Sequence, residues 1–184
     1  MIPEMSKSAY EFENTTQYRS HLEKTMRYLK DKIIPYHVVL DLGARNPLTD
    51  AIENRLSYNI HNTDGDLDVN FSMPLTIYDV IIYSHTIEHQ FNPLYTLQKL
   101  RLVMSPETRL YILLPERGKL LWCKGHFHEI DEYRMGLLLE RAGMQIISKV
   151  KQKIWRDWWF YFTGIKPLMR LFFEYHVIYE VKLK

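Results

Sequence analysis

The chain has 184 residues, a formal net charge of +2 and a hydrophobic content of 46%. These values suit one globular domain with a sizeable core, exclude disorder as the default, and do not indicate a nucleic-acid partner. The lone cysteine, Cys123, rules out a disulfide within the chain and favours a reducing compartment. Neither a signal-peptide core nor an apolar run of about 20 residues is present, so we expect a cytoplasmic protein.

The first predicted element is an amphipathic helix from Thr15 to Lys32. Apolar side chains recur along it at helical spacing, namely Tyr18, Leu22, Met26 and Leu29. We interpret residues 1–34 as a helical cover over one edge of the core. The alternative is that this helix helps to close a ligand cleft.

A strand, a glycine turn and a helix follow. The compact apolar run from His37 to Leu42 predicts the first strand. The turn begins at Gly43, and Asn46 and Pro47 are residue types that start a helix, here predicted over Leu48 to Arg55. Such a turn places backbone N–H groups of the helix start over the strand end, where anions and ligand carboxylates bind.

The segment after this helix is short for an α/β unit. Ser57 to Asn62 predicts a second strand. Asp64 lies about twenty residues beyond the glycine turn, the interval at which dinucleotide-type folds place a carboxylate for ribose hydroxyls. We interpret Asp66 and Asp68 as solvated carboxylates, because a calcium loop would need a later bidentate glutamate. Only roughly ten residues remain before Tyr78, so we expect one strand–helix unit to be trimmed.

The best-defined stretch is a strand, a polar loop, a helix and a second strand. Val80 to Tyr83 is a short β-branched run typical of a buried parallel strand. Ser84 to His89 is polar and titratable, at the point where that strand ends. Asn92 and Pro93 predict a helix start, and Leu110 to Leu114 predicts the next buried strand. Chemistry at the carboxyl end of a strand in a crossover unit is typical of α/β proteins.

The last third adds a loop, a helix and two strands. Glu116 to Glu129 has no clear period and is predicted to be a loop or lid. Asp131 to Ala142 is predicted to be a helix with its N-cap at the first residue, and Gly143 occupies the C′ position. Met144 to Val150 and Tyr175 to Lys182 predict the final strands.

An aromatic-rich insertion, residues 151–174, precedes the last strand. Its cluster consists of Trp155, Trp158, Trp159, Phe160 and Tyr161. We interpret it as core and pocket wall. The alternative is a weak membrane-surface contact through residues 154–173, with Arg156, Lys166 and Arg170 nearby.

Three segments together resemble class I S-adenosylmethionine-dependent methyltransferases, nearest to the small-molecule "type 11" group. They are VLDLG at Val39–Gly43, YDVIIYSHTIEHQFNP at Tyr78–Pro93 and FHEIDEYRMGLLLERAGMQII at Phe127–Ile147. The resemblance implies one methyltransferase-like domain over residues 1–184. It implies a Rossmann-like α/β fold with flanking helices and a mostly parallel sheet of six or seven strands, the last of them antiparallel.

The same resemblance implies S-adenosylmethionine as the cofactor. The cofactor-binding residues that it implies are Asp41, Gly43, Ala44, Arg45, Asp64, Ser84, His85 and Thr86. The chain departs from the family at Arg45 and Pro47, which stand where further glycines are usual. Arginine prevents the close backbone approach that glycine allows, but its guanidinium is suited to the methionine carboxylate.

His89 and His85 are the candidate catalytic residues, because a hydroxyl acceptor is helped by a general base that titrates near neutrality. The alternative is that Glu88 and His89 form a structural pair at the helix start. His85, Glu88 and His89 also have ligand-like spacing, with His126 and another histidine available from the later loop. Some relatives use a divalent ion here, but His85 stands where they have a second acidic ligand, so we assign no metal.

The sequence therefore predicts S-adenosylmethionine-dependent methyl transfer to a small-molecule acceptor, a hydroxyl of a sugar, lipid or quinone-type precursor. The alternative is a non-catalytic binding or scaffold protein that keeps the fold with a degenerate cofactor loop. Acceptor loops vary freely on a shared fold, so the acceptor itself does not follow from the sequence.

Overall fold

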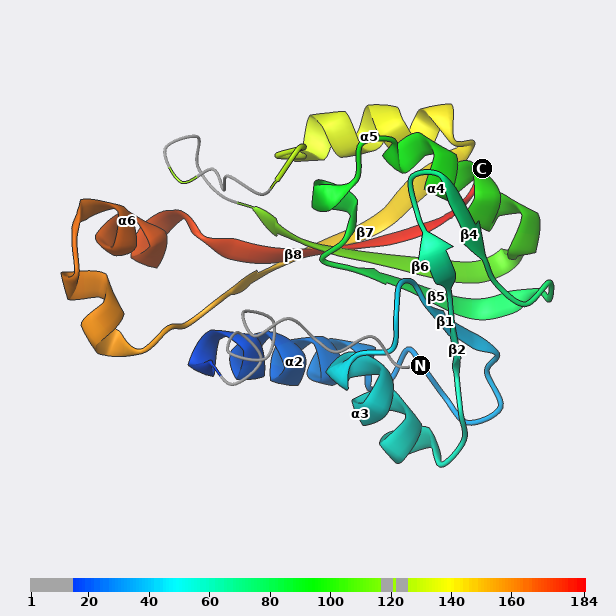
Figure 1. The fold of residues 1–184 in the computed structure, drawn as a ribbon, viewed down its shortest axis with the longest axis horizontal. Helices are drawn as coiled ribbons and strands as arrows, with labels where there is room; N and C mark the ends of the chain where they lie inside the picture. The colour runs from blue at the N-terminus through cyan, green and yellow to red at the C-terminus, as the bar shows by residue number, and fades with distance from the viewer. Residues whose placement is uncertain (1–14, 117–120, 122–125) are drawn as a thin grey trace.

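A six-stranded mixed sheet runs through the molecule (Figure 1). In spatial order its strands are β2 (His61–Asn62), β1 (Val39–Asp41), β5 (Tyr78–Ser84), β6 (Met104–Glu116), β8 (Tyr175–Leu183) and β7 (Met144–Lys153). β1 pairs in parallel with β2 and β5, and β5 with β6, whereas β8 is antiparallel to both β6 and β7. The predicted fold class, including the antiparallel last strand, is confirmed. The computed structural model describes residues 15–116, 121 and 126–184.

Helices cover both faces of this sheet. The helices are α2 (Thr16–Leu29), α3 (Pro47–Leu56), α4 (Pro93–Leu100), α5 (Glu132–Arg141) and α6 (Ile165–Phe173), with short 3-10 turns η1 (Ile87–His89), η2 (Arg101–Val103) and η4 (Trp158–Phe162). α2 and α3 lie on one face, and α4 and α5 lie on the other (Figure 1). Within the described part of the chain, no helix combines the length and apolar character needed to cross a bilayer.

The core is built from strands whose side chains alternate between the two helical layers. Val80 and Ile82 of β5 pack on the side of α2 and α3, where Leu29 is fully buried. Ile81 and Tyr83 pack on the side of α4 and α5. The N-terminal helix therefore contributes to the core through Leu29, and burial of a leucine side chain stabilises a fold by about 1.5–3 kcal/mol.

A two-stranded hairpin replaces one crossover unit, as the short spacing predicted. It comprises β3 (Asp64–Asp66) and β4 (Asn70–Ser72), and no helix separates β2 from β5. The interpretation of Asp68 as a solvated carboxylate is wrong. Its two oxygens accept hydrogen bonds from the backbone N–H groups of Phe91 at 2.9 Å and Asn92 at 2.8 Å. The carboxylate therefore ties the hairpin to the start of α4.

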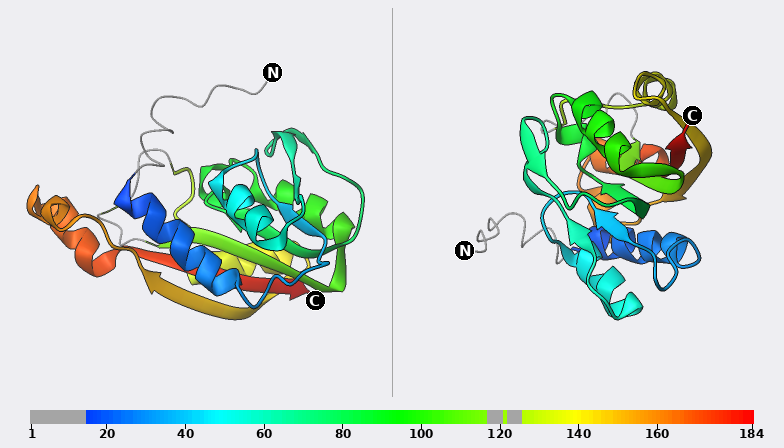
Figure 2. Two further views of the ribbon diagram at one scale, coloured as in Figure 1. Left: turned by 90° about the horizontal axis from the view of Figure 1, so that it is seen from below. Right: turned by 90° about the vertical axis from the view of Figure 1, so that its right-hand side faces the viewer.

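The aromatic insertion is not core, contrary to the sequence interpretation. Residues 155–173, here called the aromatic arm, project beyond the sheet from the ends of β7 and β8 (Figures 1 and 2). Trp158 is 76% exposed and Trp159 is 57% exposed, whereas Tyr161 is buried. The chain leaves β7 and re-enters β8 at the register of Glu116, the last described residue of β6, so none of the described strands extends beneath the arm.

The predicted loop from Glu116 to Glu129 falls largely outside the described residues, and so does Cys123. Its end, from His126 onward, is described and runs to the N-cap residue Asp131. The predicted helix starts at Asn46, Asn92 and Asp131 are all confirmed, because each side chain accepts a backbone N–H of the first turn.

Candidate functional site

A cavity of about 530 Å³ opens at the carboxyl ends of β1 and β5. Residues 42–44 line it after β1, and residues 84–86 line it after β5. Gln17, Tyr18 and His21 of α2 complete one wall of the cavity. The volume lies in the range of roughly 300–1,000 Å³ typical of small-molecule sites. The position is the switch point at which open α/β sheets bind ligands.

A buried carboxylate holds the turn after β1. Asp41 is fully buried and accepts hydrogen bonds from Thr49 Oγ1 at 2.6 Å and Asn46 Nδ2 at 2.9 Å. Asn46 also caps α3 by accepting from the N–H groups of Leu48 and Thr49. Burial raises the pKa of Asp41 to about 6, although the bonds from Thr49 and Asn46 act in the opposite direction. Asp41 does not line the cavity; it fixes the backbone that does.

Gly43 and Ala44 present main chain to the cavity. Gly43 has φ +105°, a conformation that side chains disfavour, and a Cβ there would meet no atom within 4 Å. Its N–H donates to Thr63 Oγ1 at 2.8 Å, which ties the turn to the end of β2. Ala44 is exposed and lines the cavity. These two residues leave room for a ligand to approach the backbone closely.

Two other predicted cofactor residues lie outside the cavity lining. Arg45 forms an ion pair with Asp50 at 2.7 Å and a two-pronged ion pair with Glu53, so its side chain turns back onto α3. Asp64 is exposed at the start of β3, just beyond the end of β2. Their cofactor roles stay predictions.

The end of β5 supplies the opposite wall. Ser84, His85 and Thr86 all line the cavity, and His85 has the unusual φ of +50° for a non-glycine residue. The backbone N–H of His85 donates to Leu113 O at 2.8 Å, and its Nδ1 lies 3.5 Å from Glu88 Oε1. Burial opposes ionisation of Glu88, but the hydrogen bond and charge of His85, a backbone hydrogen bond and the charge of His89 together outweigh it, so the pKa of Glu88 is lowered.

Glu88 also organises the loop that carries His126. Its backbone carbonyl accepts from the N–H groups of Phe127 at 2.9 Å and His128 at 3.2 Å. His89, the neighbouring candidate base, is exposed at the rim of the cavity. Its ring packs edge-on against that of His126 with centroids 4.8 Å apart, and His126 Nδ1 lies 3.1 Å from Glu129 Oε1. The rim therefore holds two imidazoles backed by a carboxylate.

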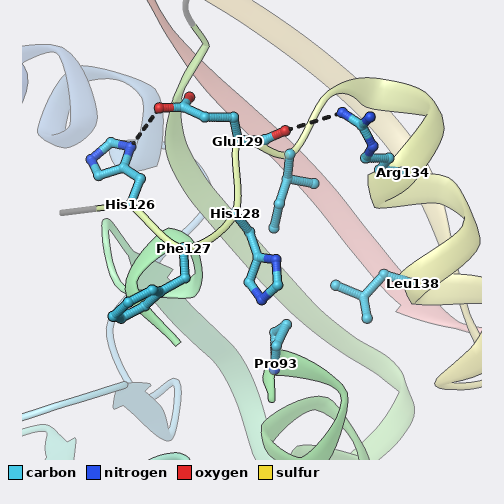
Figure 3. A pocket seen from close by; sticks show the side chains of 8 residues that line it. Pro93, His126, Phe127, His128, Glu129, Arg134 and Leu138 are labelled. Carbon is cyan, nitrogen blue, oxygen red and sulfur yellow. Dashed lines mark hydrogen bonds and ion pairs between the residues drawn. The ribbon is translucent and has the colours of Figure 1, made fainter. Parts of the chain in front are cut away.

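The same loop lines a second cavity, of about 440 Å³ (Figure 3). Pro93 at the start of α4, His128 and Leu138 of α5 line it. Arg134 of α5 contacts the Glu129 carbonyl, as the dashed line in Figure 3 marks. His126 lines both cavities, so the loop forms the partition between them.

Sequence reasoning missed two histidines beside the first cavity. The rings of His21 on α2, His85 and His176 on β8 lie with all three centroid separations at 4.9 Å. His176 is completely buried. His21 could have been found because it lies three and four residues after Tyr18 and Gln17, on the same helix face. No local pattern marks His176.

No protein-family model matches the sequence, and comparison with curated protein sequences finds no match. Solved structures do resemble the chain. An S-adenosylmethionine-dependent methyltransferase from Clostridium acetobutylicum is 10% identical, with a TM-score of 0.60 over 96% of this chain and 98% of that one. The Burkholderia thailandensis 1,6-didemethyltoxoflavin-N1-methyltransferase is 12% identical, with a TM-score of 0.56 over 96% and 82%. The [4+2]-cyclase SpnF is 12% identical, with a TM-score of 0.60 over 88% and 80%.

The chain has the Rossmann-like fold of class I S-adenosylmethionine-dependent methyltransferases. At 10–12% identity the likeness concerns the fold, and a cyclase shares it. The residues at the carboxyl ends of β1 and β5 must therefore carry any argument about chemistry.

The raised pKa of Asp41 makes stability depend on pH in a defined direction. The stability linked to this group is fully present below its unfolded pKa, near 3.8, and is lost as pH rises through about 6. Relative to Asp41→Asn, the wild type should gain about 1 kcal/mol in unfolding free energy between pH 7.5 and pH 5. Urea denaturation of both proteins at the two pH values measures this. The exposed-site control Asp64→Asn removes a carboxylate of the same charge, and an equal effect there would contradict the assignment to Asp41.

Proposed function

We propose that this protein transfers a methyl group from S-adenosylmethionine to a hydroxyl of a small-molecule acceptor. The observation that carries the proposal is the cavity between the turn after β1 and the loop after β5, at the switch point of a methyltransferase fold. The Burkholderia neighbour acts on a small molecule and was solved with S-adenosylhomocysteine bound. A sugar, lipid or quinone-type precursor remains the proposed acceptor class.

The residues present fit the cofactor. The open space in front of Gly43 admits a ligand against the backbone, and Ala44 extends the same surface. Ser84, His85 and Thr86 would flank the methionine end, and Asp64, at the start of β3, would take the ribose hydroxyls. When bound, the cofactor supplies an electrophilic methyl group. The protein's main task is then to align acceptor and donor, which dominates catalysis of such displacements.

Of the two candidate bases, His89 is the better placed. It is exposed at the rim of the cavity, where an acceptor hydroxyl has access to its ring. His85 has its Nδ1 against Glu88, and its Nε2 is buried away from solvent. The proposal therefore assigns proton removal to His89, with His126 and Glu129 behind it, and assigns His85 to the cavity wall.

Cofactor binding is the first test. Isothermal calorimetry with S-adenosylmethionine and S-adenosylhomocysteine should give saturable heats for the wild type. Ala44→Trp places a bulky ring in the cavity and should weaken both affinities by roughly tenfold or more, equivalent to about 1.4 kcal/mol. Leu75→Trp adds the same side chain at a position that is 89% exposed and should leave affinity unchanged. No heat with either ligand would favour the non-catalytic scaffold.

The role of His89 is the second test. With an accepted hydroxyl substrate, His89→Ala should lower kcat by about 10²-fold while leaving calorimetric cofactor affinity unchanged, because a base acts only in the chemical step. Release of S-adenosylhomocysteine over a panel of hydroxyl compounds measures the rate. His128→Ala removes a histidine that lines the second cavity instead and serves as control. Full activity of His89→Ala would leave Glu88 and His89 as a structural pair.

Membrane-surface association is a second candidate function, supported by the aromatic arm. None of the residues of α6 is buried. The exposed apolar side chains of the arm are Trp155, Trp158, Trp159, Phe162, Ile165, Leu168, Phe172 and Phe173. Aromatic side chains on a projecting amphipathic element are typical of proteins that lie on the lipid interface.

Charge contributes less to this surface than the sequence suggests. Arg156 and Arg170 both pair with the buried carboxylate of Glu174, at 3.0 Å and 2.7 Å. Lys166 is exposed on α6. Apolar insertion, rather than attraction to anionic lipid, is therefore the expected source of affinity.

Because of the aromatic arm, we expect the protein to co-sediment with vesicles of neutral phosphatidylcholine as well as with vesicles that contain anionic lipid. Replacing both Trp158 and Trp159 by alanine should reduce the bound fraction several-fold, because two exposed apolar rings are lost. Tyr36→Ala removes an aromatic ring that is 95% exposed elsewhere and should not change binding. Wild-type protein that stays in the supernatant with both vesicle types, or that dimerises through the arm instead, would contradict the membrane function.

A further inference from the structure

The three histidines beside the first cavity come from parts of the chain that are far apart in sequence. His21 lies on α2, His85 follows β5, and His176 lies on β8. One ring nitrogen from each lies within 4.8 Å of the other two. His21 and His85 also line the cavity, so the cluster borders it.

Buried ring nitrogens of His176 and His85 have no hydrogen-bond partner among the described residues. His176 is completely buried, and neither of its ring nitrogens has a hydrogen-bond partner among the described residues. The buried Nε2 of His85 has none in the same part of the chain. Each such group costs about 1–3 kcal/mol unless something satisfies it, so the arrangement calls for a ligand.

The charged groups around the cluster are compatible with a bound cation. The Lys24 amino group donates a hydrogen bond to the carbonyl oxygen of Lys153. Glu88 supplies the compensating anion next to His85.

The contact between Glu88 and His85 orients the latter for ligation. A neutral His85 that carries its proton on Nδ1, which lies 3.5 Å from Glu88 Oε1, has its lone pair on the buried Nε2. A carboxylate behind a ligating histidine is the usual way in which proteins fix the tautomer and raise the basicity of the ring. Gln152, which lies opposite His176 on β7, has a buried amide oxygen without a partner among the described residues and is a candidate for the same task.

We infer that His21, His85 and His176 bind a divalent transition metal ion of the zinc type, with a fourth coordination position open toward the cavity. Three histidines and one open position form a donor set that zinc uses in catalytic sites. Nitrogens bound to tetrahedral zinc at 2.0–2.1 Å lie about 3.3 Å apart, so loading draws the rings together by at most roughly 1.5 Å. An ion there would polarise an acceptor oxygen, a role that rests on the proposed function, whereas the site itself does not.

A second cluster provides control variants for the metal-binding experiment. Ligand atoms of Glu88, His89 and His126 also lie within 4.8 Å of one another. His89 is exposed, and His126 Nδ1 already faces Glu129 Oε1 at 3.1 Å. Histidines of the two clusters can be replaced separately, so metal binding can be assigned to one cluster or the other.

The experiment uses untagged protein, stripped with a chelator and titrated with cobalt(II) as a spectroscopic stand-in for zinc. The wild type should develop the visible absorption of a tetrahedral cobalt site and rise in Tm with zinc. His21→Ala and His176→Ala should each weaken cobalt affinity by about 100-fold or more. His89→Ala and His126→Ala should retain wild-type affinity.

Variants at two positions distinguish a loss of folding from a loss of metal binding. His176 is part of the core, so His176→Ala is first checked by circular dichroism; His21 is only partly buried on α2 and keeps the test decisive if the core variant unfolds. No visible band with excess cobalt in the wild type, or loss of the band in His89→Ala and His126→Ala alone, would overturn the inference. Cofactor calorimetry on the stripped protein reports the proposed function independently of these outcomes.

Discussion

The buried carboxylate of Asp41 is the interaction on which the geometry of the site depends. It binds Asn46 and Thr49, and Asn46 in turn caps α3. The Asn62 amide donates to the backbone carbonyl of Asp41 at 3.0 Å, which adds β2 to the same group of contacts. An uncompensated buried charge would be costly, but the hydrogen bonds offset part of this cost and make the turn rigid. The rigid turn is what leaves Gly43 open to the cavity.

The hairpin that replaces the trimmed crossover unit also depends on one side chain, that of Asp68. A full strand and helix would have covered the edge of the sheet and positioned the start of α4. Here a short hairpin does so, and Asp68 reaches across to the N–H groups of Phe91 and Asn92. Because α4 follows directly after the loop with His85 and His89, the hairpin stabilises the cavity wall from outside.

The architecture could be predicted because its signals are local. Asn46, Asn92 and Asp131 indicate helix starts, because N-capping depends only on residues close in the sequence. The missing unit followed from counting residues between Asp68 and Tyr78. The positions of residues 84–86 at the cavity followed from the rule that ligands bind at strand ends.

The parts that failed depend on contacts between distant segments. Aromatic richness is compatible with core or with an exposed surface, and only the register at which β6, β7 and β8 end places Trp158 and Trp159 outside. The ion pairs of Arg45 with Asp50 and Glu53 were not predicted, and the cofactor role of Arg45 stays a prediction. His176 became a site residue only through the pairing of β8 with β6, which sets it opposite Pro115.

A methyltransferase and a cyclase share this fold, so the fold alone does not distinguish the two activities. The distinction must come from side chains at the strand ends, here the imidazoles. Glu88 is the group that both histidine clusters share. A carboxylate with a lowered pKa in a buried position needs a cationic or proton-donating partner, and His85 provides it. When His85 carries its proton on Nδ1, its lone pair lies on the buried Nε2. Glu88 therefore serves the structural and the chemical interpretation through different atoms: its backbone carbonyl holds the loop that carries His126, and its carboxylate contacts His85.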